Sequence, residues 1–328
     1  MKILIIRFSS LGDVVLSTPV IAALREKFPH AEIFFLVREE YAPILPNGIK
    51  CLAIEGRPSL QKLYALVHKH EPFDAILDLQ SNILSRLLSL ILRGRKKAHF
   101  QKPYLRRLLT VVTKRNFLKN TPPVAERYLT TLHKLWPDYD FHPPMRPLLR
   151  RQALPPSLHR KLQKNPYFVI APGSRHFTKR WPLSHQESLL SLLQKKWPSS
   201  LVIFIGSQRE REECEYLKQK TKLSSYNLAG KLSLPQIITL IDKARFVLCN
   251  DSGLMHLAAA TDTPIYALFT STIPEFGFIP LSPQAKILMA KDISCRPCSH
   301  IGLSKCPKKH FRCAYELTPQ MVFREIVK

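Results

Sequence analysis

The feature of this sequence that most constrains its fold is an alternation of short apolar runs with longer amphipathic stretches. A β-branched run at Lys2–Phe8 is followed by a polar turn and then by an apolar-periodic stretch from Val14 to Phe28. This change of pattern predicts a strand, a loop and a helix in that order. Further strands are expected at 31–37 and 73–79, the second leading into an amphipathic stretch at 83–92. The first half therefore has the pattern of an α/β structure.

The same alternation restarts after a proline-rich segment. Residues 142–156 contain five prolines and little apolar periodicity, which is typical of a semi-rigid linker. Beyond it, strands are predicted at 167–171, 201–205, 246–249 and 264–269, and helices at 183–196, 210–222 and 253–261. A length of 328 residues also favours two domains over one. We expect two Rossmann-like domains with parallel sheets, at 1–150 and 151–328, that face each other across a cleft.

The net charge of +26, from 50 Lys and Arg against 24 Asp and Glu, indicates a polyanionic partner or surface. Nucleic acid, anionic lipid and a phosphorylated substrate all meet this requirement. The most basic stretch is Arg93–Lys119, predicted as helix and loop, which has ten Lys and Arg and no Asp or Glu. A solvated helical face normally mixes both signs of charge, so an anion-facing role is favoured. The leucines of this stretch and Tyr104 would suit lipid headgroups.

No apolar run reaches the roughly 18 to 20 residues needed to span a bilayer. Arg7 interrupts the first apolar run before it can form the core of a signal peptide. We therefore expect a cytoplasmic protein, and in that compartment thiols stay reduced.

The polar turn after the first strand is one candidate site. It contains Ser9, Ser10, Gly12 and Asp13. In open α/β sheets ligands bind at the carboxyl edge, where this turn is expected, and Gly12 lets another molecule approach the backbone. The alternative is that Asp13 only caps the helix, by accepting hydrogen bonds from first-turn amides.

A second candidate site follows the strand at 167–171. Ser174 and Arg175 lie in a glycine-containing turn that leads to Lys179 and Trp181. Arg offers forked contacts to a diphosphate and Lys offers a point charge, so the loop is suited to phosphate binding. For Trp181 we favour a core role, and for Lys179 a functional one.

A third candidate site lies where the strand at 246–249 turns into a helix. Asp251, Ser252 and Gly253 start this helix, and free amides at a helix N-terminus form an anion site. Asp251 is suited either to capping or to binding a sugar hydroxyl. His256, one turn into the helix, fits a packed supporting role as well as a ligand contact.

A nicotinamide dehydrogenase is the first competitor for a Rossmann-like chain. No G-x-G-x-x-G follows the first strand, and no G-x-x-x-x-G-K-[ST] occurs in a chain with ten glycines. A nucleotide site must therefore be built from helix ends and not from a glycine-rich loop.

Four cysteines near the C-terminus form a fourth constellation, comprising Cys295, Cys298, Cys306 and Cys313. Their spacing opens with C-x-x-C and would suit a structural zinc, although the second pair is looser than in familiar zinc ribbons. A reduced thiol cluster and an environment-dependent disulfide are the alternatives. Cys51, Cys214 and Cys249 are most simply buried small residues.

Three ordered motifs, spanning nearly the whole chain, resemble glycosyltransferase family nine, the lipopolysaccharide heptosyltransferases, and its second type in particular. The motifs are KILIIRFSSLGDVVLSTPVIAALREKFP, APGSRHFTKRWP and NLAGKLSLPQIITLIDKARFVLCNDSGLMHLAAA. The resemblance implies a GT-B fold, in which the N-terminal domain receives the acceptor and the C-terminal domain binds ADP-heptose. It implies inverting transfer of heptose to the Kdo or heptose residues of the lipid A core.

The resemblance also assigns roles to residues. Asp13 would be the general base, Lys179 would neutralise the departing diphosphate, and Ser9, Ser10 and Gly12 would shape the acceptor side. On the donor side, Ser174, Arg175, Asp251, Ser252, Gly253 and His256 would bind phosphates and sugar, with Leu232 on the adenine and Glu210 at the ribose.

The resemblance implies that no metal cofactor is required, while assistance by Mg²⁺ stays compatible with it. The phosphorylated acceptor would give the basic stretch its reason and hold the enzyme on the cytoplasmic face of the inner membrane. Two rival hypotheses stay open. One is a relative that uses another nucleotide sugar, and the other is a zinc-containing nucleic-acid-binding protein, although no nucleic-acid motif accompanies the charge.

Overall fold

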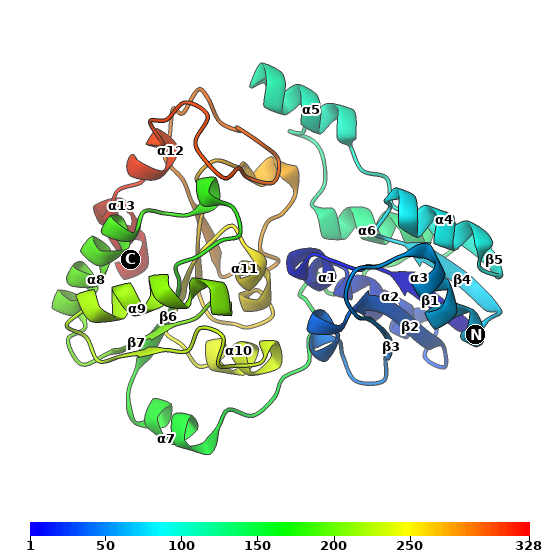
Figure 1. The fold of residues 1–328 in the computed structure, drawn as a ribbon, viewed down its shortest axis with the longest axis horizontal. Coiled ribbons are helices and arrows are strands. Elements are labelled where there is room, and N and C mark those ends of the chain that lie inside the picture. Colours follow the sequence, from blue (N-terminus) through cyan, green and yellow to red (C-terminus); the bar gives the residue numbers. More distant parts are fainter. The chain divides into compact units, whose positions relative to one another are not determined.

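The computed structural model describes residues 1–328 and divides into two compact units (Figure 1). The first unit comprises residues 1–104 and 122–150, and the second comprises 105–121 and 151–328. Assignment of 105–121 to the second unit differs from the domain limits predicted from sequence. The reason lies in long-range hydrogen bonds, because the side chains of Arg107 and Lys114 donate to the carbonyls of Phe276 and Pro297.

The first unit is built on a parallel sheet with the strand order β3-β2-β1-β4-β5. Its strands are β1 (Lys2–Ile6), β2 (Glu32–Arg38), β3 (Lys50–Ile54), β4 (Phe73–Asp78) and β5 (Gly94–His99). The central strand β1 pairs with β2 and β4, so that Ile3 lies beside Ile33 and Ala75. Its apolar run KILII is buried on both faces, as a central parallel strand requires.

The α-helices of the first unit cover this sheet. They are α1 (Leu11–Leu16), α2 (Thr18–Lys27), α3 (Leu60–Val67), α4 (Ile83–Ile91) and α6 (Val124–His133). Helix α2 packs on α6, and α3 packs on α4. The single helix expected at 14–28 is divided at Ser17, and Pro19 stands in the first turn of α2, where its missing N–H costs nothing.

The basic stretch 93–119 departs from its prediction, because it contains the strand β5 as well as helix α5 (Tyr104–Thr113). The three cations of β5, Arg95, Lys96 and Lys97, conceal a strand pattern in the sequence. They are tolerated because β5 is the edge of the sheet, where their side chains reach solvent, and charged edge strands also resist pairing with other chains.

The second unit is built on a parallel sheet with the order β11-β10-β9-β6-β7-β8. Its strands are β6 (Tyr167–Ala171), β7 (Leu201–Phe204), β8 (Ser225–Asn227), β9 (Val247–Asn250), β10 (Ile265–Leu268) and β11 (Ala285–Leu288). With α5, its α-helices are α7 (Pro156–Lys164), α8 (Leu183–Lys196), α9 (Arg211–Lys220), α10 (Leu234–Ile241), α11 (Gly253–Ala258), α12 (Arg312–Tyr315) and α13 (Pro319–Val327). The α/β architecture with two parallel sheets is the one predicted.

The core of the second unit lies between its sheet and helices α8, α9 and α13. Trp181 is fully buried there, and its indole N–H donates to the carbonyl of Leu317 at 2.8 Å, which confirms its predicted core role. Helix α8 contacts both α9 and α13 (Figure 1). None of the helices in either unit combines the length and the apolar character needed to cross a bilayer.

Both sheets have a topological switch point. From β1 the chain runs to β2 and β3 on one side and later to β4 and β5 on the other. From β6 it runs to β7 and β8 on one side and later to β9, β10 and β11 on the other. Loops that leave the carboxyl ends of strands at such a point diverge and open a crevice for ligands. The loop after β1 and the loops after β6 and β9 therefore occupy the expected ligand edges of their units.

Candidate functional site

In the first unit, Asp13 lies in the first turn of α1, directly after the switch-point strand β1. Ser10 is the N-cap, and its backbone N and Oγ donate to Asp13 Oδ2 at 3.2 and 2.8 Å. This is a reciprocal capping arrangement, in which Asp13 satisfies a donor at the helix start. The capping role considered for Asp13 is therefore real, although Ser10 and not Asp13 occupies the cap position.

The other oxygen of Asp13 is held by groups that the sequence analysis did not identify. Arg7 Nη2 lies 2.6 Å from Asp13 Oδ1, and the hydroxyl of Tyr128 donates to the same oxygen at 3.2 Å. Burial acts to raise the pKa of Asp13, but the positive charge of Arg7 and the hydrogen bonds from Ser10 outweigh it. The pKa of Asp13 is therefore lowered, and its carboxylate stays ionised at neutral pH.

The rest of the predicted acceptor-side turn is held from β4. The backbone N–H groups of Phe8 and Ser9 point to Gln80 Oε1, at 3.0 and 3.4 Å. Gly12 is buried, whereas the side chain of Ser10 is exposed beside Asp13. The turn is thus a rigid one that presents Ser10 and one edge of Asp13 to solvent.

In the second unit, the predicted residues Lys179 and Asp251 come together although they are 72 positions apart. Lys179 Nζ lies 2.7 Å from Asp251 Oδ2, and Thr272 Oγ1 donates to the same oxygen at 2.7 Å. Lys179 follows β6, Asp251 follows β9 and Thr272 follows β10, so three neighbouring strands contribute one group each. The site has a positive group at the switch point, next to a nearly buried carboxylate.

Asn250 secures the loop that carries Lys179. Its Oδ1 accepts from the backbone N of Trp181 at 2.9 Å, and its Nδ2 donates to the carbonyls of Pro172 and Gly173 at 2.7 and 3.1 Å. The loop after β6 is therefore tied at both its ends to the last residue of β9. Such preorganisation holds a cation in place without a reorganisation cost during a reaction.

The remaining donor-side residues lie on the same loops with different exposure. Ser174 is buried and its carbonyl accepts from Arg180 Nε at 2.7 Å, while Arg175 is exposed. Ser252 is the N-cap of α11, and its buried Oγ has no hydrogen-bond partner within the chain. His256 is buried inside α11, which fits the packed role considered for it.

Glu210 is fixed by hydrogen bonds, whereas Leu232 is partly exposed. Glu210 Oε2 accepts from the backbone N and Oγ of Ser207 at 2.6 and 2.8 Å. Its carboxyl group fills the space beside Gly173, where an added Cβ would meet Glu210 Oε1 at 2.1 Å. Glu210 thus joins the loops after β6 and β7, whereas Leu232 is half-exposed after the β8 loop.

The four C-terminal cysteines lie in one segment, Cys295–Cys313, but do not assemble a metal site. Burial and the neighbouring thiols raise the pKa of Cys313 to about 12, and they also raise that of Cys298. No group of three or more His, Cys, Asp or Glu side chains in the chain is arranged to hold a metal ion. Of the three alternatives considered for these cysteines, the structure shows free thiols, and it shows no arranged zinc site. Of the other cysteines, Cys214 and Cys249 are buried, but Cys51 is exposed, contrary to prediction, because it lies on the outer strand β3.

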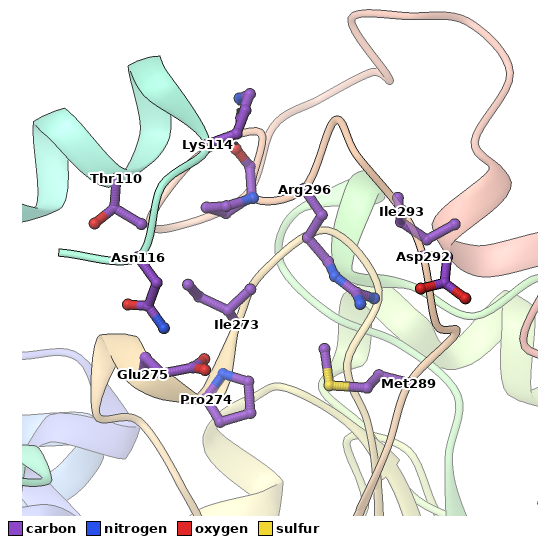
Figure 2. A pocket seen from close by; sticks show the side chains of 11 residues that line it. Thr110, Lys114, Asn116, Ile273, Pro274, Glu275, Met289, Asp292, Ile293 and Arg296 are labelled. Carbon is purple, nitrogen blue, oxygen red and sulfur yellow. Dashed lines mark hydrogen bonds between the residues drawn. The ribbon is translucent and has the colours of Figure 1, made fainter. Parts of the chain in front are cut away.

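The second unit also has a cavity of about 360 Å³ that the sequence did not predict (Figure 2). It lies between the α5 segment and the loops after β10 and β11, and Figure 2 shows the Arg296 guanidinium and the Met289 thioether facing it. Arg296 Nη2 donates to the carbonyl of Ala290 at 2.7 Å. None of the predicted site residues lines this cavity.

Comparison with known proteins places the chain in a family. A family model described as glycosyltransferase family 9 (heptosyltransferase) matches residues 64–309. The chain is 27% identical to lipooligosaccharide heptosyltransferase 2 of Haemophilus ducreyi, over 99% of this chain and 98% of the relative. It is 28% identical to lipopolysaccharide heptosyltransferase 1 of Campylobacter coli, over 83% and 84% of the two chains.

The fold is also similar to a solved one. The structure of Escherichia coli ADP-heptose LPS heptosyltransferase II superposes with a TM-score of 0.72, at 22% identity, and covers 100% of this chain and 98% of that one. The two-sheet α/β architecture described above is therefore the GT-B architecture of that enzyme.

Proposed function

Because the chain belongs to glycosyltransferase family 9 (heptosyltransferase), we propose that it transfers a heptose from ADP-heptose to the inner core of lipopolysaccharide. The acceptor is the Kdo or heptose residue carried on phosphorylated lipid A. Relatives named lipooligosaccharide heptosyltransferase 2 and lipopolysaccharide heptosyltransferase 1 match over most of their length, which supports the substrate class. The single observation that carries the proposal is the Lys179–Asp251 pair at a switch point, since a diphosphate leaving group needs a positive group held in place.

In this proposal Asp13 is the general base. Its carboxylate accepts the proton of the acceptor hydroxyl as that oxygen bonds to the anomeric carbon, while the bond from this carbon to the diphosphate oxygen breaks. The lowered pKa of Asp13 supports this role, because its carboxylate carries no proton at neutral pH and can accept one. The same lowered pKa makes the carboxylate a weak base before the reaction. Ser9, Ser10 and Gly12 hold the acceptor side, as the resemblance implies.

Lys179 neutralises the negative charge that develops on the departing ADP. Asp251 is already paired with Lys179 and Thr272 through Oδ2, so we assign it the role of orienting Lys179, in addition to the sugar contact expected from sequence. The unpartnered Oγ of Ser252 and the amide of Gly253 bind phosphate oxygens, assisted by Ser174 and Arg175. His256 supports α11, while Glu210 contacts the ribose and Leu232 packs on the adenine.

The proposed reaction needs no cofactor, since Lys179 supplies the positive charge. We expect turnover to persist in EDTA. Loss of turnover in EDTA that is restored by Mg²⁺ would instead assign part of the charge neutralisation to a divalent ion.

The deciding experiment is transfer from ADP-heptose to Kdo₂-lipid A, and to its heptosylated product, by the wild type and by Asp13→Asn. The variant keeps the size of the side chain but cannot accept a proton, so turnover is expected to fall by about 10²- to 10⁴-fold. Asp138→Asn, at an exposed position of the same unit, is the matched control and should be unchanged. Undiminished turnover by Asp13→Asn would remove Asp13 as the base, and no turnover by the wild type with either acceptor would overturn the substrate assignment.

A family member that uses another nucleotide sugar is the second candidate, and a panel of donors run in the same assay distinguishes it. A salt titration with duplex and single-stranded probes tests the nucleic-acid alternative, since such binding weakens along a log-linear salt slope.

A lipid-anchored acceptor also gives the basic stretch 93–119 a function. We propose that the protein works as a peripheral protein on the cytoplasmic face of the inner membrane. Each cation near an anionic surface contributes about 1 kcal/mol, so the cations of this stretch other than the buried Arg107 suffice to hold it there at low salt.

A further inference from the structure

Helix α5 has its polar and apolar faces reversed relative to a helix of a soluble protein. The face packed on the second unit carries Arg107 and Thr110, which are 9% and 1% exposed. The opposite face carries Leu105, Leu108 and Val112, which are 68%, 59% and 68% exposed. These positions follow i, i+3, i+7, so they form one continuous apolar row.

The reversal is held in place by specific contacts. Arg107 donates to the carbonyl of Phe276 and its guanidinium lies 5.5 Å from the ring centre of Phe278. Lys114, just beyond the helix, donates to the carbonyl of Pro297 at 2.7 Å. The polar side of α5 is therefore packed on the rest of the second unit, and its apolar row stays exposed to solvent. Single exposed apolar residues need no explanation, but a continuous row does.

Helix α4 of the first unit also has an exposed apolar row, although its buried face is mixed, since Leu88 is completely buried there beside two serines. Ser85 and Ser89 are completely buried, and Ser85 Oγ donates to Asp78 Oδ2 at 2.9 Å. The outward face carries exposed apolar side chains at the spacing of a helix, which are those of Ile83, Leu87, Leu90 and Ile91. Two helices, one in each unit, thus present apolar rows to the outside.

We propose that these outward rows of α4 and α5 insert into an anionic lipid bilayer, which deepens the proposed function by naming the anchoring elements. The charge around them selects this occupant. The stretch 93–119, which begins just after α4 and contains α5, has ten Lys and Arg and no acidic residue. A second copy of the chain would bring the same charges together, whereas anionic headgroups complement them.

The test is co-sedimentation with vesicles of phosphatidylcholine containing 30% phosphatidylglycerol. Replacing the α5 row (Leu105→Gln, Leu108→Gln, Val112→Gln) or the α4 row (Ile83→Gln, Leu87→Gln, Leu90→Gln) should weaken binding at least tenfold, although every cation remains. A control with Leu148→Gln and Met321→Gln, at exposed apolar positions elsewhere, should bind like the wild type. Binding by both row variants equal to the wild type overturns the proposal.

Two further measurements separate the alternatives. If the wild type is dimeric by light scattering and the row variants are monomeric without any change in vesicle binding, a second copy covers the rows and the proposal is wrong. Transfer to a deacylated, water-soluble acceptor should be unchanged in the row variants. Absence of transfer by a wild type that still binds vesicles would count against the proposed function and leave the docking surface standing.

A separate observation concerns the cysteine-rich segment, which is bonded to the loop that carries Lys179. The backbone N of Thr178 donates to the carbonyl of Leu303 at 3.1 Å, and the backbone N of Leu303 donates to Thr178 Oγ1 at 2.8 Å. Phe177 stacks on Phe311 with ring centres 5.1 Å apart. The two residues that precede Lys179 are thus held by this segment.

Gly302 brings the same segment against the side chain of Lys179 itself. Its φ of +99° lies in the left-handed region, and an added Cβ would lie 3.0 Å from Lys179 Cγ and Cδ and 2.6 Å from His176 Cβ. Only glycine allows this approach without displacing a neighbour. Gly302 therefore covers one side of the aliphatic part of the Lys179 side chain and limits its movement.

From these contacts we infer that Gly302 and the cysteine-rich segment are positioning elements for Lys179, an inference that rests on the role proposed for that lysine. Gly302→Ala should lower kcat for heptose transfer about tenfold or more and leave the KM for the acceptor unchanged. Gly56→Ala is the matched control, since Gly56 has a φ of +61° with nothing near its Cβ. In a Lys179→Met background, Gly302→Ala should have no further effect, because it acts through that lysine.

Labelling of Lys179 by an amine-reactive reagent, followed by mass spectrometry, tests the inference without turnover. Displacement of Lys179 from Asp251 should raise its labelling rate several-fold in Gly302→Ala and leave it unchanged in Gly56→Ala. Unchanged labelling, or additive losses in the double variant, would overturn the inference. Normal turnover of Lys179→Met would instead remove the catalytic role of Lys179, while the labelling result would still decide whether Gly302 positions it.

Discussion

The loops after β1 and after β6 place a carboxylate beside a cation in each unit, but the two pairs are built differently. In the first unit both partners are local, because Arg7 directly follows β1 and Asp13 lies in the first turn of α1, and Tyr128 completes the contact. In the second unit Lys179 and Asp251 come from different loops and are joined only by the order of the strands. In the first pair, Arg7 keeps the Asp13 carboxylate ionised. In the second pair, Asp251 holds the ammonium group of Lys179 in place. Variants at the two pairs should therefore separate these two roles.

The largest effect is expected on stability, from Arg7→Leu. The guanidinium is 4% exposed, and its loss leaves the Asp13 carboxylate buried without its cation. Removing one partner of a buried pair costs about 3–5 kcal/mol of the free energy of unfolding, which urea denaturation would measure. The matched control is Arg38→Leu, which removes an exposed pair with Glu40 and should cost less than about 1 kcal/mol. Equal losses in the two variants would show that the Arg7 pair is not a buried one.

Lys179→Met is expected to act on turnover. Loss of a held positive group beside the leaving diphosphate should lower kcat by about 10²- to 10³-fold. Lys195→Met, at an exposed position of α8, should leave kcat unchanged. If Lys179→Met affected only the free energy of unfolding, the second pair would be structural, and the comparison would fail.

Thr272→Val tests how the second carboxylate is held. The variant removes the 2.7 Å hydrogen bond to Asp251 Oδ2 and nearly preserves the size of the side chain. A hydrogen bond to a charged group contributes roughly 1.5–3 kcal/mol, so the free energy of unfolding should fall by that amount. Tyr128→Phe, which removes the longer 3.2 Å bond to Asp13, should cost less. The reverse order would show that Tyr128 holds Asp13 more firmly than Thr272 holds Asp251.

The smallest effect is a dependence on pH. The pKa of Asp13 is lowered in the folded chain, so its ionisation stabilises the fold above its unfolded pKa of roughly 3.9. This contribution is lost as the pH falls through the folded pKa. The difference in unfolding free energy between the wild type and Asp13→Asn should therefore be constant from about pH 7 to pH 5 and change only at lower pH. A difference that already changes near pH 6 would mean that the pKa of Asp13 is raised.

Most of the architecture could be predicted from local pattern. The strand at 167–171 and the helix at 183–196 are found with the predicted limits, because buried runs and amphipathic periodicity are local properties. The strand β5 was missed because its cations mask a strand that lies at a sheet edge. Cys51 was wrongly predicted to be buried for a related reason, since burial depends on the position of β3 in the sheet.

The predicted site residues were identifiable because they stand at strand ends, where parallel sheets bind ligands, and because their motifs resemble a family. The partners of those residues were not. Tyr128 lies 115 positions from Asp13, and no local signal marks it. Arg7 is visible in the sequence only as a charge within an apolar run, a feature that could have been interpreted as a buried ion pair.

By itself, the sequence determined the alternation of strands and helices and the switch from one unit to the next near residue 150. It also determined which polar residues follow the carboxyl ends of the strands. Tertiary structure alone decided which of these residues meet. The pairing of Lys179 with Asp251, the docking of α5 through Arg107, and the contact of Gly302 with Lys179 all join segments distant in the chain. Local patterns encode burial and turn geometry, whereas long-range contacts depend on the order of strands in a sheet, which no single segment specifies.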